Sequence, residues 1–133
     1  MPIKSTREMV AAANAELTVI PAEKAIEMLG AEGVTFVDIR DVRERWRDGA
    51  IPGAWHVPRG MLEFWIDPTS PYAKEEFQTG NTFVLYCAGG MRSALATKIA
   101  QDMGLSPVAH IETGFGGWKK AGGPVEEIKP KER

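Results

Sequence analysis

Cys87 is the single cysteine of the chain and the residue best suited to covalent chemistry. The residues that follow it are Ala88, Gly89, Gly90, Met91 and Arg92. Because the two glycines carry no side chain, the backbone can curl tightly and turn several N–H groups inward. A thiolate inside that curl would be stabilised by the amides, by the dipole of a following helix and by Arg92. The pattern predicts that Cys87 is catalytic and that the residues after it bind an anionic substrate.

A structural role for the same residues is the alternative. A lone cysteine after a buried strand often serves as a small core residue, and glycines before a helix often serve only a tight turn. The conjunction of strand, cysteine, glycines, arginine and helix within a short stretch favours the catalytic interpretation. With one cysteine, the chain cannot form an internal disulfide, so any transfer chemistry at Cys87 must end on an external molecule.

The elements that would position Cys87 alternate between short apolar runs and helical patterns. We expect strands over residues 17–20, 34–39, 54–58, 82–86 and 108–112. We expect helices over residues 5–14, 21–29, 42–49 and 93–103, a helical turn in the long connection 59–81, and a final helix around Trp118. This alternation predicts an α/β fold with about five strands in a mainly parallel sheet and helices on both faces. Cys87 then lies at the carboxyl end of its strand, where open parallel sheets bind ligands.

Composition and charge narrow the class of protein. The chain has 133 residues, enough for one domain with one hydrophobic core, and a formal net charge of −2. This charge argues against a nucleic-acid partner, because nucleic-acid-binding domains usually carry a net basic face. The opening residues lack the apolar run of a secretory signal or a membrane span, so we predict a cytoplasmic protein without a membrane partner. Neither His56 nor His110 has a ligand-like neighbour, so we expect no metal.

Three separated motifs carry a resemblance to a known family. The stretch CAGGMRS resembles the active-site loop of the rhodanese family, in which a cysteine, a glycine and an arginine recur at the spacing of Cys87, Gly90 and Arg92. The stretches VDIRDVRERWRDGAIPGAWHVP and HIETGFGGWKKAGGPVE resemble two further signatures of that family. The resemblance covers most of the chain and rests on motifs that are far apart in the sequence.

The resemblance implies one rhodanese-like domain over residues 17–127. A helical extension over residues 1–16 would precede it, and a charged tail over residues 128–133 would follow it. The family has a five-stranded parallel core and a cysteine persulfide intermediate, which here would form on Cys87 without a cofactor. The chain departs from the pattern at Ala50, where many members have histidine, so a local polar contact is expected to be missing.

The activity implied by the resemblance is sulfur transfer. A sulfane sulfur would move from thiosulfate, or a related small anionic donor, to cyanide, a thiol or a protein cysteine. Two alternatives stay open. Related phosphatases of the cell-division-cycle 25 type and some arsenate reductases carry five residues between the cysteine and the arginine, whereas this chain has four. The shorter loop should crowd a phosphate. The other alternative is a rhodanese-like module that senses oxidants or binds partners without catalysis.

The long connection after the third predicted strand supplies candidates for the edge of the pocket. Arg59, Phe64 and Trp65 form a possible rim. Loops often carry functional residues, but aromatic side chains under a loop usually serve packing. Trp118, which follows a glycine-rich stretch, is predicted to lie in the core.

Charged residues after the second predicted strand have structural interpretations. Asp38 and Arg40 follow that strand, and in the resembling family the matching pair is chiefly structural. The next segment alternates in charge, which predicts a solvated helix face. Its charged residues are Asp41, Arg43, Glu44, Arg45, Arg47 and Asp48.

Overall fold

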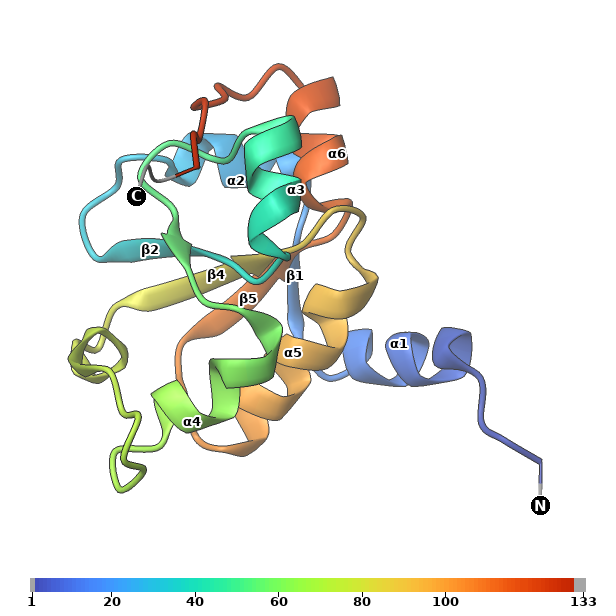
Figure 1. The fold of residues 1–133 in the computed structure, drawn as a ribbon. Coiled ribbons are helices and arrows are strands. Elements are labelled where there is room, and N and C mark those ends of the chain that lie inside the picture. Colours follow the sequence, from blue (N-terminus) through green and yellow to red (C-terminus); the bar gives the residue numbers. More distant parts are fainter. Residues whose placement is uncertain (1, 131–133) are drawn as a thin grey trace.

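The computed structural model describes residues 2–130 and contains one sheet of five parallel strands (Figure 1). The strands are β1 (Thr18–Ile20), β2 (Val34–Asp38), β3 (Trp55–His56), β4 (Thr82–Tyr86) and β5 (Val108–Ile111). Their order across the sheet is β1-β5-β4-β2-β3, which puts β4 in the centre. The predicted α/β fold with a five-stranded parallel sheet is confirmed.

Helices cover both faces of this sheet. They are α1 (Thr6–Asn14), α2 (Ala22–Met28), α3 (Val42–Asp48), α4 (Leu62–Ile66), α5 (Met91–Asp102) and α6 (Gly114–Lys120). Two short 3-10 segments, Arg59–Met61 and Glu75–Gln78, lie in the connection between β3 and β4. Figure 1 shows α1, α4 and α5 on one side of the sheet and α2, α3 and α6 on the other. The N-terminal helix α1 packs along α5.

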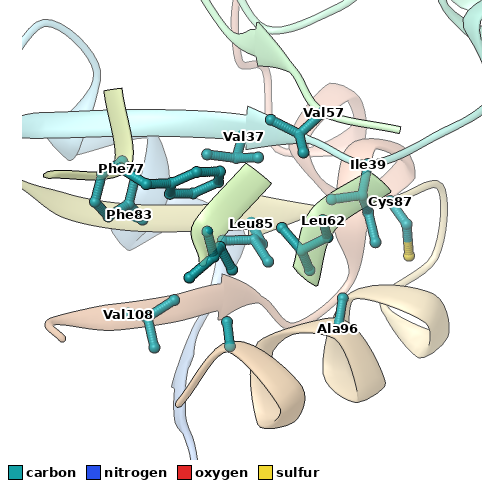
Figure 2. Packing of buried hydrophobic residues seen from close by; sticks show 12 residues of the cluster. Val37, Ile39, Val57, Leu62, Phe77, Phe83, Leu85, Cys87, Ala96 and Val108 are labelled. Atoms are coloured by element: carbon teal, nitrogen blue, oxygen red, sulfur yellow. The ribbon is translucent and has the colours of Figure 1, made fainter. Parts of the chain in front are cut away.

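The central strand β4 contributes to the core on both faces of the sheet, because successive residues of a strand point in opposite directions. Phe83, Leu85 and Cys87 join one buried layer together with residues of α4 and α5 (Figure 2). Val84 and Tyr86 join the other layer together with residues of α2 and α6. Cys87 therefore continues the alternation one residue past the strand and faces the layer that contains α5.

Two element boundaries differ from the sequence prediction by two residues, and the others agree within one residue. Helix α5 begins at Met91 rather than at residue 93, because Gly90 has a left-handed backbone (φ 103°) that ends the loop directly before the helix. The strand predicted over residues 54–58 shortens to Trp55–His56. Pro58 has no N–H to continue the ladder, and the chain turns there into the 3-10 segment that begins at Arg59.

A buried polar cluster fixes the carboxyl end of β2. The Asp38 carboxylate is fully buried and accepts hydrogen bonds from Arg40 (2.8 and 2.9 Å), from Arg45 Nε (3.0 Å) and from the Tyr86 hydroxyl (3.0 Å). A buried charge is stable only when it is paired and hydrogen-bonded, so these contacts support the structural interpretation of Asp38 and Arg40. The prediction of a solvated helix face is wrong for Arg45, because its side chain turns inward to Asp38 and is only 11% exposed.

The C-terminal segment folds back onto the domain at Ala50. The backbone N–H of Ala50 donates to the Glu126 carbonyl (2.9 Å), and the N–H of Glu126 donates to the Ala50 carbonyl (2.8 Å). Ala50 is fully buried beneath this bridge, where a histidine would need more room.

Trp118 is also fully buried, as predicted. Residues 131–133 of the predicted charged tail lie outside the described residues. Within residues 2–130, no helix is both long and apolar enough to span a bilayer.

Candidate active site at the Cys87 loop

Cys87 lies at the base of the loop that joins β4 to α5. Its side chain is almost fully buried, and its sulfur accepts hydrogen bonds from the backbone N–H groups of Gly90 (3.1 Å) and Ser93 (3.4 Å). The hydroxyl oxygen of Ser93 lies 3.6 Å from the same sulfur. Figure 2 shows Cys87 at the end of the hydrophobic layer, beside Ile39 and Leu62. The sulfur therefore has apolar side chains on one side and backbone donors on the other.

The first turn of α6 holds the carbonyl groups of the loop. The N–H of Phe115 donates to the Cys87 carbonyl (2.8 Å), and the N–H of Gly116 donates to the Ala88 carbonyl (2.9 Å). Because these two carbonyl oxygens point at α6, their negative ends are kept away from the sulfur. The arrangement leaves an anion near Cys87 to face N–H groups, which is the polarity an anion-binding loop requires.

Two glycines permit this close packing around the loop. Gly90 has φ 103°, and a Cβ atom there would collide with the Glu112 carbonyl oxygen. Gly114 has φ 63°, and a Cβ atom there would lie 2.6 Å from the Cys87 carbonyl oxygen. Both positions combine a left-handed backbone with a neighbour that cannot move freely, so each excludes a side chain.

Substituting Gly114 with alanine is expected to disturb the loop as well as the stability of the domain. A matched control is Gly104→Ala, because Gly104 has φ 102° but no atom within 4 Å of the added Cβ. We expect Gly104→Ala to cost about 1–2 kcal/mol of unfolding free energy from backbone strain alone, without changing the alkylation rate of Cys87 by iodoacetamide. Gly114→Ala should lower the unfolding free energy by more than Gly104→Ala does, and it should change the alkylation rate of Cys87. Equal rates in the two folded variants would contradict the role of α6 in shaping the loop.

Arg92 and Glu44 form an ion pair beside the loop. Arg92 lies in the first turn of α5, and its Nη1 and Nη2 atoms each donate to one Glu44 carboxylate oxygen at 2.9 Å. These hydrogen bonds lower the pKa of Glu44 to about 2, so its carboxylate stays ionised at neutral pH. Glu44 also accepts the backbone N–H of Asp41 (3.0 Å) in the capping box of α3. The prediction of a solvated helix face is therefore wrong for Glu44, whose carboxylate joins the start of α3 to the start of α5.

The loop residues predicted to bind the substrate differ in exposure. Ala88, Gly89, Met91 and Arg92 are exposed at the mouth of the loop, whereas Gly90 is buried against Cys87. The sulfur is therefore enclosed by Gly90 and Ser93 on one side and by the apolar layer on the other, while the remaining loop residues face solvent.

Comparison with known proteins identifies the family of this chain. The family model described as rhodanese-like domain matches residues 21–121. The chain belongs to the rhodanese-like domain family. One similar solved structure is that of a protein of unknown function from Rhodopseudomonas palustris, named as a possible tyrosine phosphatase. Its sequence is 56% identical to that of this rhodanese-like domain protein. That likeness has a TM-score of 0.90 and covers 95% of this chain and 99% of the other.

Curated relatives of this rhodanese-like protein include named sulfurtransferases. The thiosulfate sulfurtransferase GlpE of Actinobacillus pleuropneumoniae is 27% identical over 109 residues, which are 82% of this chain and 93% of the relative. The probable adenylyltransferase/sulfurtransferase MoeZ of Mycobacterium tuberculosis is 28% identical over 103 residues. That match covers 77% of this chain but spans only 24% of the length of MoeZ. The family relationship thus connects the chain with sulfurtransferases as a class.

The residues proposed for the pocket rim lie in different environments. Phe64 is 52% exposed, and Arg59 pairs with Glu63 of α4 (2.8 Å). Trp65 instead stacks on Trp55, with ring centroids 5.9 Å apart, and packs against the hydrophobic layer. These contacts give Trp65 a packing role, while Phe64 and Arg59 stay candidates for the rim.

Among residues 2–130, no group of three or more His, Cys, Asp or Glu side chains could hold a metal ion.

Three polar residues form a hydrogen-bonded chain that begins at the sulfur, and the sequence predicted no such role for any of them. The Ser93 hydroxyl lies 2.9 Å from His110 Nδ1, and His110 Nε2 lies 2.7 Å from the Asn14 side-chain oxygen. Ser93 follows directly after Arg92 in the loop motif, which was a usable signal. The parallel pairing of β4 with β5 puts Leu85 beside His110 and so brings His110 near the loop. No local signal marked Asn14, because its neighbour in space is 96 residues away.

Burial of His110 is expected to make stability depend on pH. Burial lowers the pKa of His110 to about 4 from the ordinary value of 6.5. As the pH falls from about 6.5 to about 4, the unfolded chain binds a proton that the folded protein does not, so the unfolding free energy falls. The full effect is on the order of 3 kcal/mol. Urea unfolding across this range should show a flatter pH dependence for His110→Gln, and an unchanged slope in that variant would contradict the assignment.

Proposed function

We propose that this protein is a sulfurtransferase that carries a sulfane sulfur as a persulfide on Cys87. The observation that supports this most directly is the sulfur of Cys87 within hydrogen-bonding distance of two backbone N–H groups, with the loop carbonyls turned to α6. Such donors stabilise negative charge at sulfur without a metal or a cofactor. The sulfurtransferases among the relatives agree with this class of chemistry.

In the first half of the proposed reaction, the Cys87 thiolate attacks the outer sulfur of thiosulfate. A bond forms between the two sulfur atoms, and the bond between the outer sulfur and the sulfite sulfur breaks with its electron pair leaving on sulfite. The products are sulfite and a Cys87 persulfide anion. The loop N–H groups and the Arg92 guanidinium would bind the donor's oxygens and the charge that grows on the leaving sulfite.

In the second half, an external nucleophile removes the outer sulfur. Cyanide, a thiolate or a protein cysteine attacks that sulfur, and the electron pair of the broken bond returns to Cys87 as thiolate. The acceptor must come from outside, because no second cysteine exists in the chain. Met91 in the loop and Phe64 in α4 are exposed, so both are candidates for contact with an acceptor.

Intact-mass spectrometry tests the proposal directly. The protein treated with thiosulfate and freed of excess reagent should gain the mass of one sulfur atom and should lose it when cyanide is added. The control is the same treatment of protein alkylated at Cys87. Absence of any gain with thiosulfate, and with a protein persulfide as donor, would favour the non-catalytic binding or sensing module.

Phosphate chemistry is the second candidate, because the solved relative that is 56% identical carries the description of a possible tyrosine phosphatase. We expect little hydrolysis of a small aryl phosphate. The loop has four residues between Cys87 and Arg92, one fewer than the phosphatase pattern, and should crowd a tetrahedral phosphate bonded to sulfur. Insertion of one glycine after Gly90 should weaken sulfur transfer. Aryl phosphate hydrolysis with a higher kcat/KM than thiosulfate transfer would reverse the order of the two candidates.

A further inference from the structure

A chain of buried hydrogen bonds runs from the sulfur of Cys87 to the N-terminal helix. The Ser93 hydroxyl lies 3.6 Å from the Cys87 sulfur and 2.9 Å from His110 Nδ1. His110 Nε2 lies 2.7 Å from Asn14 Oδ1 at the end of α1. Ser93 and His110 are 0% and 1% exposed. The sequence resemblance assigns no role to these contacts, and the proposed transfer steps do not use them.

The direction of each hydrogen bond follows from the Asn14 end. An amide oxygen can only accept, so His110 Nε2 carries the proton that it donates to Asn14 Oδ1. The neutral ring then leaves Nδ1 as an acceptor at 2.9 Å from the Ser93 hydroxyl, closer than the other acceptor, the Gly90 carbonyl oxygen at 3.3 Å, so Nδ1 takes the hydroxyl hydrogen. Burial supports the neutral form, because it lowers the pKa of His110 to about 4. With its hydrogen turned to His110, the Ser93 oxygen presents lone pairs to Cys87 and can accept from the S–H group.

We propose that Asn14 and His110 are positioning residues that set the direction of the Ser93 hydroxyl and thereby limit the fraction of Cys87 present as reactive thiolate. A hydroxyl that turns its hydrogen toward sulfur stabilises the thiolate, whereas one that turns its lone pairs toward sulfur stabilises the thiol. The inference rests on the proposed role of Cys87 as the nucleophile. It gives α1 a function at the active site in addition to packing on α5.

The end of α1 is held in place independently of Asn14. Gln101 of α5 donates from its side chain to the Glu16 carbonyl (3.0 Å), and Ala13 is buried. Gln101 therefore anchors the same end of the helix without touching the hydrogen-bond chain to Cys87. The variant Gln101→Leu is the matched control for Asn14→Leu, because each removes one polar contact of this segment.

The test is the alkylation rate of Cys87 by iodoacetamide at neutral pH in folded protein. In Asn14→Leu, His110 loses its acceptor at Nε2, its proton moves to Nδ1, and the ring donates to Ser93. The Ser93 hydrogen is then shared between the Gly90 carbonyl oxygen (3.3 Å) and the sulfur (3.6 Å), so that in part of the molecules it stabilises the thiolate. We expect about a three- to tenfold faster alkylation and no change in Gln101→Leu. In a Ser93→Ala background, the Asn14→Leu substitution should have no effect, because the hydroxyl that carries the coupling is gone.

Three outcomes would overturn the inference. They are an unchanged or slower rate in Asn14→Leu, an equal increase in Gln101→Leu, and an increase that persists in the Ser93→Ala background. The alkylation readout does not require sulfur transfer. A protein that shows the coupling but gains no sulfur from any donor would therefore refute the proposed transfer while leaving the positioning role intact.

Discussion

Replacement of Cys87 by serine is expected to abolish sulfur transfer. A serine hydroxyl fits the same buried space but is a far weaker nucleophile for sulfur and does not form a persulfide. We expect the rate of thiocyanate formation from thiosulfate and cyanide to fall by more than about a thousandfold, as when a covalent nucleophile is removed from other enzymes. Initial rates over a range of thiosulfate concentrations measure the effect.

The fold of the serine variant must be intact for that result to count. Cys87 is a core residue as well as a candidate nucleophile, so its substitution could also lower stability. Urea unfolding of Cys87→Ser reports that loss separately, and a cooperative transition shows that the variant is folded. Transfer by the folded serine variant at a rate within about tenfold of the wild type would exclude the persulfide mechanism at this residue.

Removal of the Arg92 guanidinium should cause the second largest loss. A charge-assisted hydrogen bond contributes about 1.5–3 kcal/mol, so Arg92→Ala should lower kcat/KM for thiosulfate by roughly ten- to a hundredfold. Arg92→Lys should recover only part of this loss, because an ammonium group lacks the two parallel N–H groups that match an oxyanion. Steady-state kinetics on both variants measure the two values.

Two further variants make this prediction specific. Arg47→Ala removes an exposed arginine that also pairs with a carboxylate, Asp48, and should leave kcat/KM unchanged. Arg92→Ala leaves Glu44 without its partner, so the double variant Arg92→Ala/Glu44→Gln separates the loss of the guanidinium from the effect of an unpaired carboxylate. Wild-type efficiency in both the single and the double variant would mean that the backbone alone binds the donor.

Local sequence was sufficient for the elements that carry the loop. The apolar run that ends in Cys87 predicted a buried strand, and the glycines followed by a helical pattern predicted a turn into a helix. These signals depend on side-chain size, backbone freedom and the period of each element, all of which are properties of neighbouring residues. The sequence did not predict the exact start of α5, because the left-handed backbone of Gly90 fixes it.

Charge patterning was misleading where a partner lay elsewhere in the chain. Arg45 and Glu44 alternate in sign with their neighbours, which is typical of a solvated helix. Both instead turn toward the domain, Arg45 to the buried carboxylate of Asp38 and Glu44 to Arg92. A charged residue is solvated or paired according to what faces it, and the sequence of its own helix does not contain that information.

The sequence by itself determined the parallel α/β fold, the position of Cys87 at a strand end and the glycine loop around it. Only the tertiary structure decided what surrounds that loop: the Phe115 N–H on the Cys87 carbonyl, Glu44 on Arg92, and the contact of His110 with Asn14. These partners come together because the strand order β1-β5-β4-β2-β3 sets β5 and β2 on either side of β4. Hydrogen bonds act over about 3 Å, so which groups meet depends on how the strands are ordered, and residue spacing along the chain does not encode that order.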